Sequence, residues 1–131
     1  MKINEIKGII ESTWENRELL KESASQDAIR EVIDLLDQGI IRVCEPTSTG
    51  WQNNDWIKKA VILYFPICKM ETIECAPFEF HDKIPLKNNF AKAGVRVVPH
   101  AIARYGSFLE SGTIMMPSYV NIGAYVGSGT M

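Results

Sequence analysis

A six-residue repeat runs through the last part of the chain and limits what this part can fold into. Large apolar residues recur at every sixth position, and small residues form a second series with the same spacing. The apolar series is Ile102, Phe108, Ile114, Val120 and Val126. The small series is Gly106, Gly112, Ser118, Ala124 and Thr130. Neither the helical period of about 3.6 residues nor the strand period of about two produces this spacing.

A period of six is typical of a parallel β-helix, in which short strands lie along the flat faces of a prism. The large residue of each hexad is expected to fill the interior, and the small residue allows a close approach at the corner. Each strand then pairs with the coils above and below it. A solenoid of this kind has no natural end within a coil, so we expect the sequence to be cut short after Met131.

The earlier part of the chain has a helix-rich pattern instead. Apolar residues spaced by three and four positions predict helices over 3–14 and 28–36, and a third helix is expected over 55–65. Ser25 and Asp27 are candidate caps at the start of the second helix.

Breaking residues and short apolar runs divide the segments between these helices. Gly39 follows the second helix, and Pro66 is expected to end the third. Short strands are expected over 40–45 and over 67–74.

Together these patterns predict an α/β protein with two domains. A helix-rich α+β domain is expected over 1–95, and an incomplete β-helix domain, consisting of its first coils, over 96–131.

Composition excludes several classes of partner. Hydrophobic residues make up 46% of the chain and charged residues 23%, which is ordinary globular usage, so we expect a soluble protein. The net charge of -2 gives no basic surface for nucleic acid or an anionic membrane. The sequence has no apolar run long enough for a membrane span, and its start does not resemble a signal peptide. The three cysteines, with no CxxC spacing, suit reduced thiols in the cytoplasm.

His81 and Asp82 are neighbours in "FHDKIPLK" and raise the question of a base with an orienting carboxylate. Sequence neighbours do not reliably face each other, so a surface turn is the preferred interpretation.

The string "RVVPHAIARYGSFLESGTIMMPSYVNIGAYV", from Arg96 to Val126, resembles the start of the left-handed β-helix of the tetrahydrodipicolinate N-succinyltransferases. Within it, "MPSYVNIGAYV" is highly specific. The resemblance extends back through "FHDKIPLK" and "DWIKKAVILYF" and so covers essentially the whole chain. The hexads alone would indicate only the broader superfamily of hexapeptide-repeat acyltransferases.

The resemblance implies an enzyme of the diaminopimelate and lysine pathway that works as a cytoplasmic homotrimer. Its active sites lie in clefts between neighbouring β-helices, and it binds no permanent cofactor or metal. Succinyl-CoA is the co-substrate, and its succinyl group passes to the amino group of ring-opened tetrahydrodipicolinate. An amine that attacks a thioester must lose a proton, which a positioned carboxylate can accept.

For individual residues, the resemblance implies that Arg96, in "GVRVVP", contacts the acceptor, whose carboxylates suit a guanidinium fork. The family's catalytic Asp falls two residues beyond the methionine that matches Met131, so no catalytic residue is expected within this chain, which would be inactive alone. Gly127 and Ser128 depart from the family, which commonly has an acidic residue followed by Glu or Ser there. Gly127 would fit a tight corner. Arg104 is left without a role.

Two alternatives remain open. The missing Asp would suit a non-catalytic oligomerisation or binding module. A different hexapeptide-repeat enzyme is disfavoured because such sites rely on a histidine base or a histidine ligand cluster, and only His81 and His100 are present, without ligand spacing.

Overall fold

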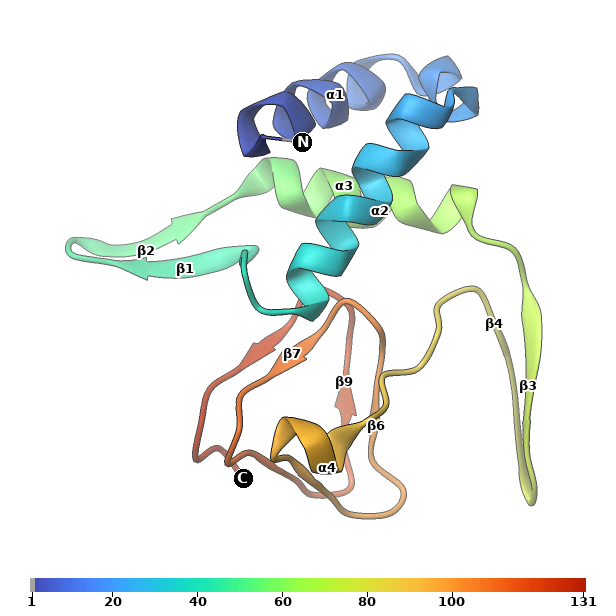
Figure 1. The fold of residues 1–131 in the computed structure, drawn as a ribbon, viewed down its shortest axis with the longest axis vertical. Helices are drawn as coiled ribbons and strands as arrows, with labels where there is room; N and C mark the ends of the chain where they lie inside the picture. Colours follow the sequence, from blue (N-terminus) through green and yellow to red (C-terminus); the bar gives the residue numbers. More distant parts are fainter. Residues whose placement is uncertain (1) are drawn as a thin grey trace.

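Helices pack together at one end of the molecule, and very short strands wind around one another at the other end (Figure 1). The computed structural model describes residues 2–131. The helices are α1 (Ile3–Glu15), α2 (Ser23–Asp37), α3 (Asp55–Ile67) and the single turn α4 (Phe90–Ala93), with a 3-10 turn at Arg17–Lys21. The three helices expected from the apolar spacing are therefore confirmed.

The ends of these helices differ from the expectation. Helix α2 begins at Ser23, so the expected caps Ser25 and Asp27 lie inside its first turns. Ser25 is buried instead, where its hydroxyl accepts a hydrogen bond of 3.0 Å from Thr13 Oγ1 of α1. Pro66 lies within the last turn of α3, which continues to Ile67.

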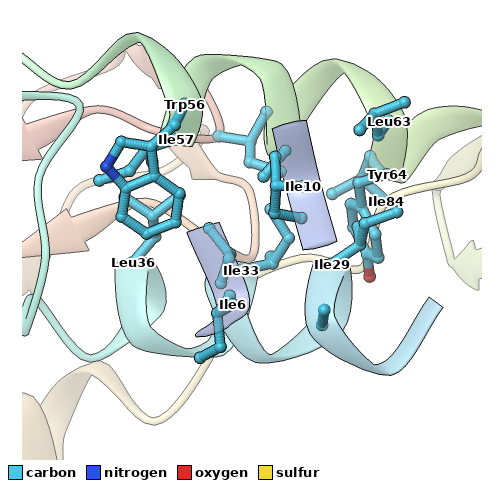
Figure 2. Packing of buried hydrophobic residues seen from close by; sticks show 14 residues of the cluster. Ile6, Ile10, Ile29, Ile33, Leu36, Trp56, Ile57, Leu63, Tyr64 and Ile84 are labelled. Atoms are coloured by element: carbon cyan, nitrogen blue, oxygen red, sulfur yellow. The ribbon is translucent and has the colours of Figure 1, made fainter. Parts of the chain in front are cut away.

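The first three helices bury a shared aliphatic core (Figure 2). Isoleucines dominate it because their spacing places them on the inner face of each helix. The largest fully buried members on these helices are Ile6 and Ile10 of α1, Ile29, Val32 and Ile33 of α2, and Ile57 and Leu63 of α3. Two residues from outside the helices, Ile84 and Ile122, also belong to this cluster. The core therefore extends to the part of the chain that carries the repeat.

Two antiparallel hairpins project from the helical part (Figure 1). One pairs β1 (Cys44–Thr47) with β2 (Gly50–Asn53), and the other pairs β3 (Glu71–Cys75) with β4 (Phe78–Asp82). The strand expected over 40–45 is confirmed only at its end, and the one expected over 67–74 lies slightly later.

Six two-residue strands follow, and each of the first three pairs in parallel with the strand that comes three later. They are β5 (Arg96–Val97), β6 (Ile102–Ala103), β7 (Phe108–Leu109), β8 (Ile114–Met115), β9 (Tyr119–Val120) and β10 (Tyr125–Val126). The pairs are β5 with β8, β6 with β9, and β7 with β10. The chain therefore returns beside itself with every third strand.

The expected interior series is wrong in its first three members. Ala103, Leu109 and Met115 are buried in the cluster between these strands, whereas Ile102, Phe108 and Ile114 are half-buried on the alternate face. Val120 and Val126 pack against this cluster as expected.

The change of register has a local cause. Successive strands begin six residues apart except between β8 and β9, where Ile114 and Tyr119 are five residues apart. The corner glycines shift accordingly, because Gly106 and Gly112 adopt positive φ but the next to do so are Gly123 and Gly129. Ser118, Ala124 and Thr130 therefore do not continue the corner series.

The carboxylate of Asp37, at the end of α2, joins the helices to the winding strands. Its Oδ1 accepts hydrogen bonds from Lys87 Nζ at 2.7 Å and from the backbone N–H of Gly106 at 2.9 Å. The Lys87 and Asp37 side chains are only 13% and 21% exposed. One turn earlier, Asp34 Oδ1 accepts a hydrogen bond of 3.1 Å from the Tyr105 hydroxyl. Burial, and then this bond to Asp34, raise the pKa of Tyr105, so it remains a donor.

The Asp37 contact predicts a large effect of its removal. Asp37→Ala should lower the free energy of unfolding by about 2–3 kcal/mol, because it leaves the backbone N–H of Gly106 without its acceptor. It also removes the counter-charge of the mostly buried Lys87 ammonium, which keeps only its hydrogen bond of 3.0 Å to the Asp37 backbone oxygen. Urea denaturation followed by circular dichroism measures this. The control is Asp27→Ala in the same helix, whose ion pair with Arg30 is long, at 3.9 Å, and exposed. Equal losses in the two variants would contradict the assigned role.

Gly106 and Gly8 should respond in opposite directions to alanine. A Cβ at Gly106, where φ is +87°, would lie 2.8 Å from Ile122 Cγ1 and 3.0 Å from Ile33 Cγ2. Gly106→Ala should therefore destabilise the protein by about 2 kcal/mol or more. At Gly8, inside α1, nothing lies within 4 Å of an added Cβ, so Gly8→Ala should stabilise it by about 0.5–1 kcal/mol. Thermal melts of both variants give the signs, and a stabilising Gly106→Ala would overturn the packing described.

Candidate functional site

Arg96 is the site residue that the sequence proposed, and its backbone is firmly held. Helix α4 ends at Gly94, whose left-handed conformation turns the chain into β5. The Arg96 N–H donates to Thr113 O at 3.1 Å, which fixes the residue beside β8. Val95 is buried and Val97 half-buried, so the alternation of the strand leaves the Arg96 side chain exposed.

The Arg96 guanidinium has no ion pair, side-chain hydrogen bond or ring contact within residues 2–131. Arg42 and Arg104 are engaged by comparison. Arg42 stacks on the ring of Tyr125 at 3.3 Å from its centroid, and Arg104 pairs with Asp82 at 2.8 Å. A free guanidinium keeps its planar set of N–H donors for a carboxylate from outside the chain.

Arg104 fastens the β3–β4 hairpin to the strand region. One of its terminal nitrogens donates to Asp82 Oδ2 at 2.8 Å and the other to Asn121 Oδ1 at 3.2 Å. The guanidinium carbon lies 5.7 Å and 5.9 Å from the ring centroids of Phe65 and Tyr119. The backbone N–H of Lys83, and after it Arg104, lower the pKa of Asp82. These contacts assign Arg104 to the structure of the protein.

The pair His81 and Asp82 forms no acid–base unit. Both residues lie in β4, not in the expected surface turn, and neighbours in a strand point to opposite faces. His81 Nδ1 lies 2.9 Å from Thr72 Oγ1 across the hairpin, whereas Asp82 binds Arg104.

A carboxylate that the sequence did not single out, Glu110, ties together two successive passes of the chain. Its Oε1 accepts a hydrogen bond of 2.6 Å from the Tyr125 hydroxyl, and its Oε2 accepts one of 2.7 Å from the backbone N–H of Ser128. The Ser128 hydroxyl donates in turn to Ser111 O at 2.6 Å. Residues that stack on each other in neighbouring coils are about three hexads apart in the sequence. This separation is the sequence signal that could have indicated the contact between Glu110 and Ser128.

Gly127, which the sequence suggested would fit a tight corner, does not adopt the positive φ of the corner glycines. An added Cβ would lie 3.8 Å from Glu110 Oε2, an ordinary contact. The conformational need for glycine belongs to Gly123 and Gly129 instead.

Within residues 2–131, no group of three or more His, Cys, Asp and Glu side chains is placed to hold a metal ion. None of the helices described there is both long enough and apolar enough to span a bilayer.

Comparison with known proteins defines the class first. Residues 5–67 match the family model described as the N-terminal part of tetrahydrodipicolinate N-succinyltransferase. This domain belongs to enzymes whose name specifies transfer of a succinyl group to nitrogen.

Curated relatives extend the match to nearly the whole chain. Proteins named 2,3,4,5-tetrahydropyridine-2,6-dicarboxylate N-succinyltransferase are 43% identical in Alteromonas mediterranea, 47% in Polynucleobacter asymbioticus and 48% in Paracidovorax citrulli. The alignments cover 94%, 94% and 91% of this chain, and 48%, 49% and 47% of those proteins. Over more than nine-tenths of its length the chain is similar to the tetrahydrodipicolinate N-succinyltransferases, which confirms the resemblance seen in the sequence. It spans about half the length of the curated relatives it matches.

The Glu110 contacts predict a defined pH dependence. The Tyr125 hydroxyl and, next, the Ser128 N–H lower the pKa of Glu110 from its usual value of 4.5. A lowered pKa means that the stabilisation is present above the unfolded pKa and is lost as pH falls through the folded one. The stability difference between the wild type and Glu110→Gln should therefore be largest near neutral pH and shrink below about pH 4. Urea titrations at several pH values measure it, and a gap that does not depend on pH would contradict this role.

Proposed function

We propose that this chain is the N-terminal part of an enzyme that transfers succinyl from succinyl-CoA to the amino group of ring-opened tetrahydrodipicolinate, in diaminopimelate and lysine biosynthesis. The observation that carries the proposal is the 43–48% identity to named N-succinyltransferases over more than nine-tenths of the chain. Succinyl-CoA is then a co-substrate, and no cofactor is bound permanently.

The strand region is, in this proposal, the beginning of a left-handed parallel β-helix. The three parallel strand pairs and the return of the chain with every third strand support it, since three hexads make one coil. The domain boundary stays a proposal at 95/96, and two separate apolar clusters support a division close to it, although Val95 and Phe90 already pack with the strand cluster. One lies among the helices and the other between the short strands. Ile122 crosses this boundary because it reaches the helical core.

Arg96 is proposed to bind a carboxylate of the acceptor. Its exposed side chain and its lack of a partner within residues 2–131 support this role. The hydrogen bond from its backbone N–H to Thr113 O fixes the point on β5 from which the side chain extends. Exposed Met116, just past β8, offers an apolar surface near the neighbouring strand. A second copy placed against this side would enclose the acceptor, which is consistent with a homotrimer whose sites lie between subunits.

The chemical step is proposed to use carboxylates outside these 131 residues, so the chain alone would not catalyse it. The attacking amine must transfer a proton to a base, and the thioester carbonyl must be polarised as the tetrahedral intermediate forms. Arg96 contributes by orienting the amine of the bound acceptor toward the thioester. The net charge of -2 gives no support for a nucleic-acid or membrane partner, and a cytoplasmic location suits the small-molecule substrates.

The product of the complete reading frame tests both the reaction and the residue. Release of CoA from succinyl-CoA should depend on tetrahydrodipicolinate. Arg96→Gln should raise the KM for that acceptor by about 10- to 100-fold, because it removes charge-assisted hydrogen bonds worth about 1.5–3 kcal/mol. The KM for succinyl-CoA should change little.

Arg30→Gln is the matched control, since Arg30 is exposed on α2 and makes only a long ion pair and one hydrogen bond, of 3.3 Å, to Gln26. It should leave both KM values unchanged. A product that releases no CoA would sink the enzymatic proposal and favour the binding module, whereas an unchanged acceptor KM in Arg96→Gln would remove only the role of Arg96.

A further inference from the structure

Two corners of the winding chain stack on each other beneath the helices. The first is Tyr105–Gly106, between β6 and β7, and the second is Ile122–Gly123, which comes three strands later between β9 and β10. The backbone N–H of Gly123 donates to Gly106 O at 2.9 Å, so the corners are in direct contact. In Figure 1 the chain turns at the lower end of α2 between β6 and β7.

Each corner uses the same local arrangement to contact the helical core. A large side chain enters the core, and the glycine after it lets the backbone approach. Tyr105 packs against the helical cluster and Ile122, which is 8% exposed, is part of it. A Cβ at Gly106 would lie only 3.0 Å from Ile33 Cγ2 of α2, and one at Gly123 would lie 3.4 Å from Val43 Cγ2.

The corners advance along the helical layer. The first lies against α2, at Ile33 and Asp37, and the second lies against Val43 and Val61, of which the latter belongs to α3. Successive strands of a ladder are about 4.8 Å apart, so a third corner would lie one such step farther on the same side.

An open groove of 440 Å³ lies beside the second corner. The second corner, Ile122–Gly123, forms one wall, and α3 forms the other with Val61 and Ile62. Its polar lining residues are Asn53, Asp55 and Lys58. Ile62 is 43% exposed, whereas the adjacent Val61 is half-buried and Leu63 is buried.

We propose that this groove is the seat of the corner of a third coil, whose apolar side chain covers Ile62 and whose following glycine stacks on Gly123. The inference rests on the β-helix of the proposed function. Two observations select this occupant. The groove continues the interface that the first two corners already form, and the curated relatives are about twice as long as the chain. The chemistry required is an apolar residue followed by glycine, one further coil along the chain from Ile122–Gly123.

Photo-crosslinking identifies the occupant directly. The product of the complete reading frame is made with p-benzoylphenylalanine in place of Ile62 and, as a control, in place of Ile3, which is similarly exposed, at 48%, on α1. Irradiation at Ile62 should give a cross-link within one chain, mapped by mass spectrometry to the third corner. A cross-link between chains would mean that a second copy covers the groove, and that result would overturn the proposal. So would a failure to cross-link, or a reading frame without a third coil.

A second measurement does not depend on the bulky probe. Ile62→Glu in the same protein should lower the Tm by about 5 °C more than Ile3→Glu, because a charge would be buried beneath the third corner. Equal Tm changes would contradict the proposal. Succinyl transfer is assayed on the unmodified protein so that the two inferences can be tested separately. Activity together with equal Tm changes would contradict only the third-corner contact. Absence of activity together with a larger Tm change for Ile62→Glu would contradict only the enzymatic reaction.

Discussion

The contact on which the rest of the structure depends is the one between the end of α2 and the first corner of the winding chain. Asp37 receives both the Lys87 ammonium and the Gly106 N–H in a mostly buried place, and Asp34 receives the Tyr105 hydroxyl beside it. A charged acceptor can satisfy several donors at once where water is largely excluded. This joint therefore fixes the position of the first corner against the helices, and later strands stack on the ladder that follows from it.

The short strands pack apolar side chains on two sides, toward their own interior and toward the helical part, which explains why the repeat is not uniform. The inner series contains Ala103, Leu109 and Met115, while Phe108 on the alternate face packs against Gly39 after α2. Apolar residues are thus needed on adjacent positions of a two-residue strand. The five-residue step between β8 and β9 then changes which member of each pair continues the six-residue spacing.

Two arginines near the strands show how surroundings separate a structural from a functional role. Arg104 donates to Asp82 and Asn121 and lies 5.7 Å and 5.9 Å from two aromatic ring centroids, so both terminal nitrogens of its guanidinium are engaged within the protein. Arg96 is presented by an ordered strand, yet it has no partner among residues 2–131. An ordered but uncommitted guanidinium is suited to bind an anionic group that arrives from outside.

The sequence by itself determined the helices, the presence of a six-residue repeat and the family, because apolar spacing and a long specific string are local properties of the chain. It also pointed to Arg96 through its match to the family. Only the tertiary structure decided that Leu109, not Phe108, faces the interior, that Glu110 binds the Ser128 N–H, and that Asp37 joins the two parts. These facts depend on which residues meet across a long stretch of intervening chain, and a one-residue change of register reverses the face of every later side chain.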